Sequence, residues 1–198
     1  MLPGKRSALL DLNDADKREG LLAGADVVVT GYRPGALDRF GLAPEALAAR
    51  HPGLVIVTLS AWGTDGPWGS RRGFDSLVQA ACGIAVDEGR PEAPGALPAQ
   101  VLDHATGYLA AAGALLAVEQ QRRDGGSPHV QLSLAGTAAW LQGLPRAAPE
   151  DVPDVDPAPH LVEKGRFTLS APPGTVDGEA LTWPDPPPAY GAATPEWT

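Results

Sequence analysis

The chain has 198 residues, 43% of them hydrophobic, and a formal net charge of -9. This length suits one domain with its own core, with or without a tail. The acidic balance argues against nucleic acid as a partner, and a single cysteine, Cys82, excludes an internal disulfide and suits a reducing cytoplasm. We find no secretory signal, and the most apolar run, residues 109–118, is too short to span a bilayer. We therefore expect a soluble cytoplasmic protein that does not bind membranes.

Apolar runs alternate with helical patterns in the first sixty residues. Residues 7–12, 26–30 and 54–60 have the composition of buried strands, and the second is β-branched and apolar almost throughout. Helices are expected between them, over residues 13–24 and 44–50. Strand, helix, strand, helix, strand at this spacing predicts right-handed crossovers and a parallel, Rossmann-like α/β sheet.

Loops rich in glycine and proline follow the second and third predicted strands. Ligands of open α/β sheets bind beyond the carboxyl ends of strands, which is where residues 31–35 and 61–73 fall. Farther on, we expect a helix over residues 74–84, a long helix within residues 97–123, a strand over residues 129–134 and a helix over residues 135–144.

Proline is concentrated at the end of the chain, where twelve of the 21 prolines lie from Pro145 onward. We therefore predict an α/β domain over residues 1–145 and an irregular, extended, proline-rich tail over residues 146–198. Residues 166–183 could form a hairpin within this tail.

Asp103 is the carboxylate at the start of the long helix. It stands where an N-cap residue would stand, next to free backbone N–H groups and the positive end of the helix dipole. That position is expected to keep the carboxylate ionised, as a carboxylate nucleophile must be. Its position alone leaves two interpretations open, a helix cap and a nucleophile.

Common catalytic motifs are missing from the sequence. It has no GxGxxG, GxxxxGK[ST], HExxH, GxSxG or CxxC pattern, and its four histidines are scattered, so we expect no metal site.

The order of four segments carries a family resemblance. They are GKRSALLDL (residues 4–12), ADVVVTGYRPGALDRFGL (25–42), HPGLVIVTLSAWGTDGPWGSRRGFDSLVQAACG (51–83) and LPAQVLDHATGYLAAAGALLA (97–117). In this order and spacing, over residues 4–145, the chain resembles the family III CoA-transferases, a group that includes formyl-CoA transferase and α-methylacyl-CoA racemase. The resemblance implies part of that family's large domain.

The resemblance gives Asp103 the role of nucleophile, because it lies in the segment VLDHATGY. In such transferases this carboxylate attacks an acyl-CoA thioester, passes through a mixed anhydride and becomes an aspartyl-CoA thioester, from which an acceptor acid takes the CoA. The expected substrates are therefore an acyl-CoA and a carboxylic acid, with no permanently bound cofactor.

Further binding residues are implied by the same resemblance. Those for the adenosine and phosphate end of CoA are Arg39, Tyr32, Phe40 and Leu10, and those for the acyl pocket are Trp62 and Gly63. Arg39 could instead be a surface arginine paired with Asp38 or Glu45, and Trp62 could be a packing residue.

The racemases of this family have a histidine where this sequence has Phe74. Racemisation needs two acid/base groups on opposite faces of the α-carbon, so transfer is expected rather than racemisation, which stays an alternative. Asp75 is expected to be a hydrogen-bonded structural carboxylate.

Family members have a further stretch of chain before the segment GKRS. The resemblance therefore implies that this chain is a fragment, one half of a split enzyme or a reduced relative, and it leaves a non-catalytic CoA-binding subunit as an alternative function. We expect a homodimer, or a partner chain that supplies the missing part, because an incomplete sheet leaves edges to cover.

Overall fold

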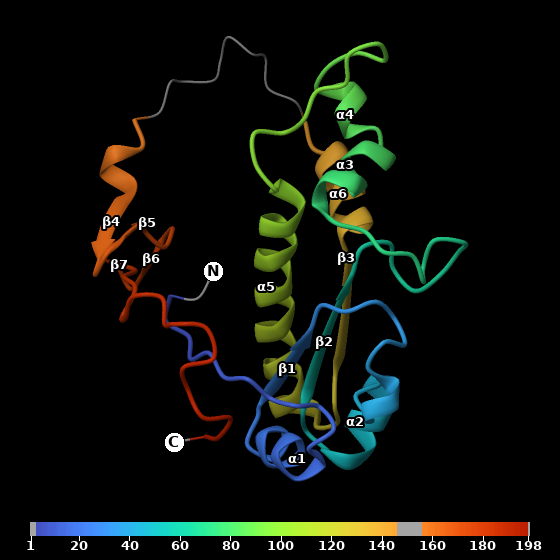
Figure 1. The fold of residues 1–198 in the computed structure, drawn as a ribbon, viewed down its shortest axis with the longest axis vertical. Coiled ribbons are helices and arrows are strands. Elements are labelled where there is room, and N and C mark those ends of the chain that lie inside the picture. Colours follow the sequence, from blue (N-terminus) through green and yellow to red (C-terminus); the bar gives the residue numbers. More distant parts are fainter. Residues whose placement is uncertain (1–2, 146–155, 198) are drawn as a thin grey trace. The chain divides into compact units, whose positions relative to one another are not determined.

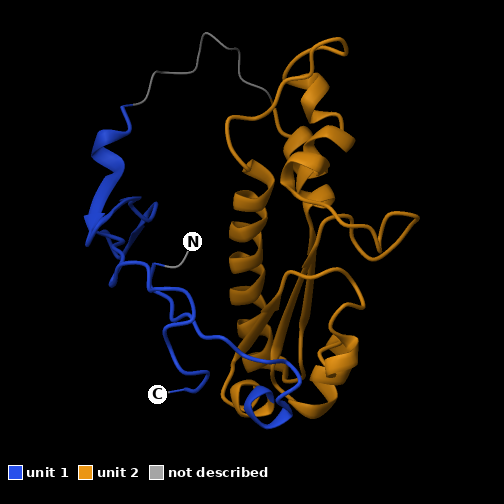
Figure 2. Ribbon diagram, in the orientation of Figure 1, with its two compact units in different colours: residues 1–18, 146–198 blue, residues 19–145 orange. Residues whose placement is uncertain are grey.

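The computed structural model describes residues 3–145 and 156–197. Two compact units are distinguished, residues 19–145 and residues 1–18 with 146–198 (Figures 1 and 2). The division into domains at residues 1–145 and 146–198 stays a prediction.

Helices and strands alternate along the larger unit. Its helices are α1 (Ala15–Ala23, which begins in the smaller unit), α2 (Pro44–Arg50), α3 (Asp75–Ala81), α4 (Ile84–Asp87), α5 (Val101–Asp124) and α6 (Leu134–Gln142), with a 3-10 turn at Asp38–Phe40. Its strands are β1 (Val27–Thr30), β2 (Val55–Ser60) and β3 (His129–Ser133).

The three strands form one parallel sheet in the order β1-β2-β3. Val27 of β1 lies opposite Val55 of β2, and Ile56 of β2 lies opposite His129 of β3. The predicted α/β class with a parallel sheet is confirmed.

Alternate residues of β2 point to opposite faces of this sheet, as the twofold period of a strand requires. Val55 and Val57 pack with Ala117 of α5, which runs along one face (Figure 1). Ile56 points the other way and packs with Leu22 of α1 and Leu47 of α2. Both faces are covered, which is why the strands are apolar almost throughout.

A third cluster joins the helices near the carboxyl ends of the strands. Val78 of α3, Ile84 of α4, Leu102 of α5 and Leu134 and Ala138 of α6 are buried against one another. Cys82 is partly buried against this cluster. The cluster fixes the first turn of α5, where Asp103 lies.

The helix predicted over residues 74–84 is two helices. Gly83, with φ of 87°, interrupts it between α3 and α4. A left-handed backbone is open to glycine at little cost and cannot continue a right-handed helix.

The smaller unit contains two hairpins in the proline-rich tail. They pair β4 (Leu161–Lys164) with β5 (Phe167–Ser170) and β6 (Thr175–Val176) with β7 (Glu179–Ala180), after a 3-10 turn at Ala158–His160. The tail is thus more regular than predicted, although residues 146–155 lie outside the described part of the chain.

The strand predicted over residues 7–12 is wrong. This segment forms only one isolated parallel bridge, between Ala8 and Ala193, with Ser7 accepting the N–H of Gly191 through Oγ at 2.9 Å. An apolar run becomes a strand only where a partner offers a matching row of hydrogen bonds.

α5 is apolar on both of its faces. Its outer face exposes Tyr108, Leu115 and Leu116, with 63%, 73% and 67% of their surface accessible. Among the described residues, it is the helix that is long and apolar enough to cross a membrane, by length and composition only. The apolar helix, Val101–Asp124, is thus longer than the run of residues 109–118 considered in the sequence. The inner face of α5 is apolar because it packs on the sheet.

Candidate active site

Asp103 lies in the first turn of α5, as its third residue. The prediction that Asp103 occupies the N-cap position is therefore wrong. Gln100 is the N-cap residue, and its side chain makes no capping hydrogen bond. The backbone N–H of Asp103, in this first turn, instead donates to a side chain from another helix.

Asp75, at the start of α3, supplies that acceptor. Its Oδ2 accepts the backbone N–H of Asp103 at 2.9 Å, and its Oδ1 accepts the side-chain amide of Gln79. Gln79 in turn accepts the N–H of Leu97 at 3.2 Å. Asp75 is 1% exposed and Gln79 is 5% exposed. The prediction that Asp75 is a hydrogen-bonded structural carboxylate is confirmed, and what it holds is the backbone of Asp103.

The same contact changes the acidity of Asp103. Partial burial raises the pKa of the Asp103 carboxyl above its ordinary value, the neighbouring Asp75 carboxylate raises it further, and His104 opposes both. The sequence led us to expect the helix terminus to favour ionisation. The pKa shift has the opposite direction because the Asp103 carboxyl is partly buried and because a second negative charge, that of Asp75, lies beside it.

A cavity of about 190 Å³, the Asp103 cavity, lies beside this carboxylate at the carboxyl ends of β1 and β2. The residues lining it are Gly31, Tyr32, Arg33, Pro34, Leu59, Ser60, Ala61, Arg71, Gly73, Phe74, Asp103 and Leu134. Asp103, two arginines, Ser60 and Tyr32 thus line one small cavity.

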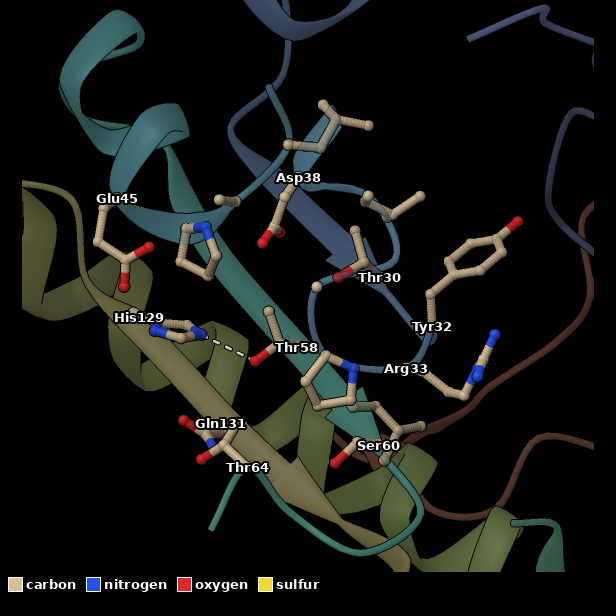
Figure 3. Close-up of a pocket in the computed structure, with 17 residues that line it drawn as sticks. Thr30, Tyr32, Arg33, Asp38, Glu45, Thr58, Ser60, Thr64, His129 and Gln131 are labelled. Carbon is tan, nitrogen blue, oxygen red and sulfur yellow. Dashed lines mark hydrogen bonds between the residues drawn. The ribbon is translucent and has the colours of Figure 1, made fainter. Parts of the chain in front are cut away.

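A larger cavity of about 360 Å³, the His129 cavity, adjoins it (Figure 3). Residues 32–34, 59 and 60 line both cavities. Polar side chains of all three strands line the larger one, and Thr58 Oγ1 lies 2.8 Å from His129 Nε2. The two cavities offer an elongated ligand adjoining sites, one of them next to Asp103.

The residues predicted to bind the adenosine and phosphate end of CoA differ in whether they line these cavities. Tyr32 lines both cavities and is 63% exposed. Arg39 and Phe40 line neither, and the Arg39 guanidinium lies 4.5 Å from the centre of the Phe40 ring. Among the described residues Arg39 forms no ion pair with Asp38 or Glu45, which was its alternative role.

The predicted acyl-pocket residues Trp62 and Gly63 line neither cavity. Trp62 packs edge-on against Trp68, with ring centres 4.8 Å apart, and its Nε1 donates to the carbonyl of Arg72 at 3.2 Å. Gly63 donates its N–H to Ser60 Oγ at 3.0 Å. Leu10 is half-buried in the smaller unit. Binding roles for these three residues stay predictions.

Arg33 and Arg71 were missed as site residues by the sequence analysis. Arg33 follows β1 and lines both cavities, and Arg71 follows β2 and lines the Asp103 cavity. The sequence could have indicated both arginines, because both lie in loops after the carboxyl ends of parallel strands, where ligands of such sheets bind.

Phe74 also lines the Asp103 cavity and is 69% exposed. A phenyl ring has no proton to exchange, so this position does not supply the second acid/base group of a racemase. Within residues 3–145 and 156–197, no three His, Cys, Asp or Glu side chains gather as metal ligands would.

Comparison with known proteins identifies relatives of the whole α/β region. The family model of CoA-transferase family III matches residues 1–158. A probable fatty acyl-CoA transferase, Rv3272, from Mycobacterium tuberculosis is 36% identical over 166 residues, which are 79% of this chain and 42% of that protein. Succinyl-CoA–D-citramalate CoA-transferase from Chloroflexus aurantiacus is 31% identical over 71% of this chain and 36% of its own length. The chain thus spans less than half the length of these relatives.

Solved structures agree with this assignment. Crystalline Rv3272 from M. tuberculosis superposes with a TM-score of 0.66 at 35% identity, over 71% of this chain and 41% of that one. A CAIB/BAIF family protein from Brucella suis gives a TM-score of 0.67 at 28% identity, over 72% and 39% of the two chains. The resemblance seen in the sequence is confirmed, and the chain belongs to CoA-transferase family III.

Proposed function

We propose that this chain carries the nucleophile of a CoA-transferase, which moves CoA from an acyl-CoA to a carboxylic acid through an aspartyl-CoA thioester at Asp103. The observation that supports this most is the placement of Asp103. Its backbone N–H donates to the buried Asp75, and Asp103 lines a cavity at the carboxyl ends of β1 and β2.

The reaction balances without a further reactant. An Asp103 oxygen attacks the thioester carbonyl, the C–S bond breaks, and CoA leaves as a thiolate from a mixed anhydride. The thiolate attacks the Asp103 carbonyl, which releases the donor acid and leaves CoA on Asp103. The acceptor carboxylate reverses these steps and regenerates the Asp103 carboxylate.

The residues around Asp103 suit these steps. Attack on a thioester places negative charge on the carbonyl oxygen, and hydroxyl or guanidinium donors stabilise such an oxyanion. Ser60, Tyr32 and Arg33 line this cavity and carry donors of these kinds. A raised pKa makes the Asp103 carboxylate a stronger base, and therefore a better nucleophile wherever it remains ionised.

An isotope-exchange experiment tests the proposal. The chain is incubated with an acyl-CoA and its own isotopically labelled acid, with no second acid. Exchange of label into the thioester is expected, because the first half-reaction alone interconverts the two. If CoA binds without exchange, the chain is the alternative CoA-binding subunit instead.

Arg39 provides a prediction for CoA binding. If its guanidinium pairs with a phosphate of CoA, Arg39→Gln should weaken CoA binding about tenfold, since such charge-assisted bonds contribute a few kcal/mol at most at an exposed site. Calorimetric titration with CoA measures this, with Arg122→Gln near the end of α5 as the control. Equal affinities for CoA in both variants and the unchanged chain would show that Arg39 does not bind CoA.

We also propose that the chain works in an assembly, with a second copy or with a partner chain that carries further parts of the family domain. Two relatives, each 30% identical to this chain, are the alpha and beta subunits of succinyl-CoA–L-malate CoA-transferases. The outer face of α5, with Leu115 and Leu116 exposed, is an apolar surface of the kind that interfaces cover.

Replacing both leucines by glutamate should abolish this association. Sedimentation velocity is expected to show a concentration-dependent dimer or larger species for the unchanged chain and a monomer for the double variant. Val176→Glu, at an exposed position of a tail hairpin, serves as the control. A monomer at every concentration, or association that survives in the double variant, would contradict the proposed role of this face.

A further inference from the structure

Arg71 is a cationic side chain in the Asp103 cavity to which neither the sequence nor the proposed reaction gives a role. It forms no ion pair and no side-chain hydrogen bond with another described residue. Its guanidinium instead lies 5.2 Å from the centre of the Trp68 ring. Stacking on an aromatic ring leaves the N–H groups at the edge of a guanidinium available to a ligand.

The loop that carries Arg71 is held on both sides of it. The Arg71 N–H donates to the carbonyl of Trp68 at 2.8 Å, and the carbonyl of Arg72 accepts the indole N–H of Trp62 at 3.2 Å. Gly73 lies so close to Ala61 that an added Cβ would come within 2.5 Å of the alanine Cβ. The backbone is thus fixed by contacts that do not involve the Arg71 side chain.

A positive charge at the position of Arg71 favours the binding of acids that carry a second carboxylate. Asp103 and the buried Asp75 already bring two carboxyl groups to this end of α5, in a chain whose net charge is -9. A substrate that carries a second carboxylate, which takes no part in the transfer, would add like charge in a cavity of about 190 Å³. A guanidinium pairs with a carboxylate through two parallel hydrogen bonds, so it offsets that repulsion and orients the substrate.

We propose that Arg71 binds the non-reacting carboxylate of a short dicarboxylic acyl group in the Asp103 cavity, and so selects dicarboxylic over monocarboxylic substrates. Arg33, which lines both cavities, does not distinguish the two ends of the ligand in this way. This inference rests on the proposed function, since it assumes that an acyl-CoA occupies the cavity.

Two thioesters that differ in one carboxylate test this inference. Binding of succinyl-CoA and of butyryl-CoA to the full chain is measured by calorimetry, for the unchanged chain, Arg71→Gln and Arg72→Gln. The unchanged chain should bind succinyl-CoA about tenfold more tightly than butyryl-CoA, which is the difference expected from a single charge-assisted contact. Arg71→Gln should remove this preference without weakening butyryl-CoA binding. Arg72→Gln should keep it, because Arg72 lines neither cavity and holds Trp62 through its backbone.

Other outcomes separate this inference from the proposed function. If the unchanged chain binds both thioesters equally, or if Arg71→Gln keeps the preference, the selection of dicarboxylic substrates by Arg71 is wrong and CoA binding stands. If Arg71→Gln weakens both thioesters alike, Arg71 contacts the part that they share. If neither thioester binds, the proposed function fails as well.

Discussion

Replacing Asp103 by asparagine should lower the rate of CoA transfer by at least about 10³-fold, the scale of loss seen when a covalent nucleophile is removed. Affinity for CoA itself should change little, because asparagine has the same shape and keeps the backbone N–H that Asp75 accepts. Steady-state transfer between two acids, with CoA binding measured in parallel, separates these two effects.

The matched control for this variant is Asp65→Asn. Asp65 lies exposed in the loop after β2 and lines neither cavity, so its substitution removes the same charge from the chain without touching the site. Retention of a tenth or more of the transfer rate by Asp103→Asn would assign the nucleophile to another group.

Replacing Asp75 by alanine should be strongly destabilising. The carboxylate is almost completely buried and accepts one bond from the first turn of α5 and one from Gln79, whose own carbonyl holds Leu97. Removing it leaves the N–H of Asp103 without this acceptor and leaves the Gln79 amide with only the longer contact to the carbonyl of Ala99, at 3.4 Å. We therefore expect a loss of about 2–4 kcal/mol in the free energy of unfolding. Urea denaturation measures this. A loss below about 0.5 kcal/mol, the scale of a neutral surface change, would show that the network does not hold the helix start.

The variant Asp75→Asn separates the effect of the Asp75 charge from that of its hydrogen bond to the backbone of Asp103. The amide oxygen still accepts the N–H of Asp103, whereas the negative charge that helps to raise the pKa of Asp103 is gone. The pKa of Asp103 should therefore fall, so the carboxylate stays ionised to lower pH and the acid limb of the transfer rate moves to lower pH. An NMR titration of the Asp103 carboxyl carbon checks this independently of activity. An unchanged or higher pKa would mean that burial alone causes the shift.

The sequence was sufficient for the parts of this fold that depend on local pattern. β-Branched runs predicted β1 and β2, and the long alanine- and leucine-rich segment predicted α5. The run over residues 7–12 looked equally suitable for a strand but found only one bridge, at Ala8. Strand formation depends on a neighbour, which a local pattern does not contain.

The candidate site shows the same limit. Asp103 could be singled out from its place at the start of a long helix, and the family resemblance gave it a role. Its hydrogen-bond partner Asp75 lies 28 residues away, and the two meet only because α3 and α5 pack in one cluster. The direction of the Asp103 pKa shift follows from that packing, through burial and the nearby Asp75 charge, so the helix terminus alone predicts the wrong direction.

Intact-mass spectrometry after brief incubation with an acyl-CoA shows whether Asp103 becomes covalently attached to CoA. We expect an added mass of one CoA less one water, its conversion to a hydroxamate at Asp103 by hydroxylamine, and neither product in Asp103→Asn. An adduct mapped to another residue, or one that persists in Asp103→Asn, would contradict this attachment.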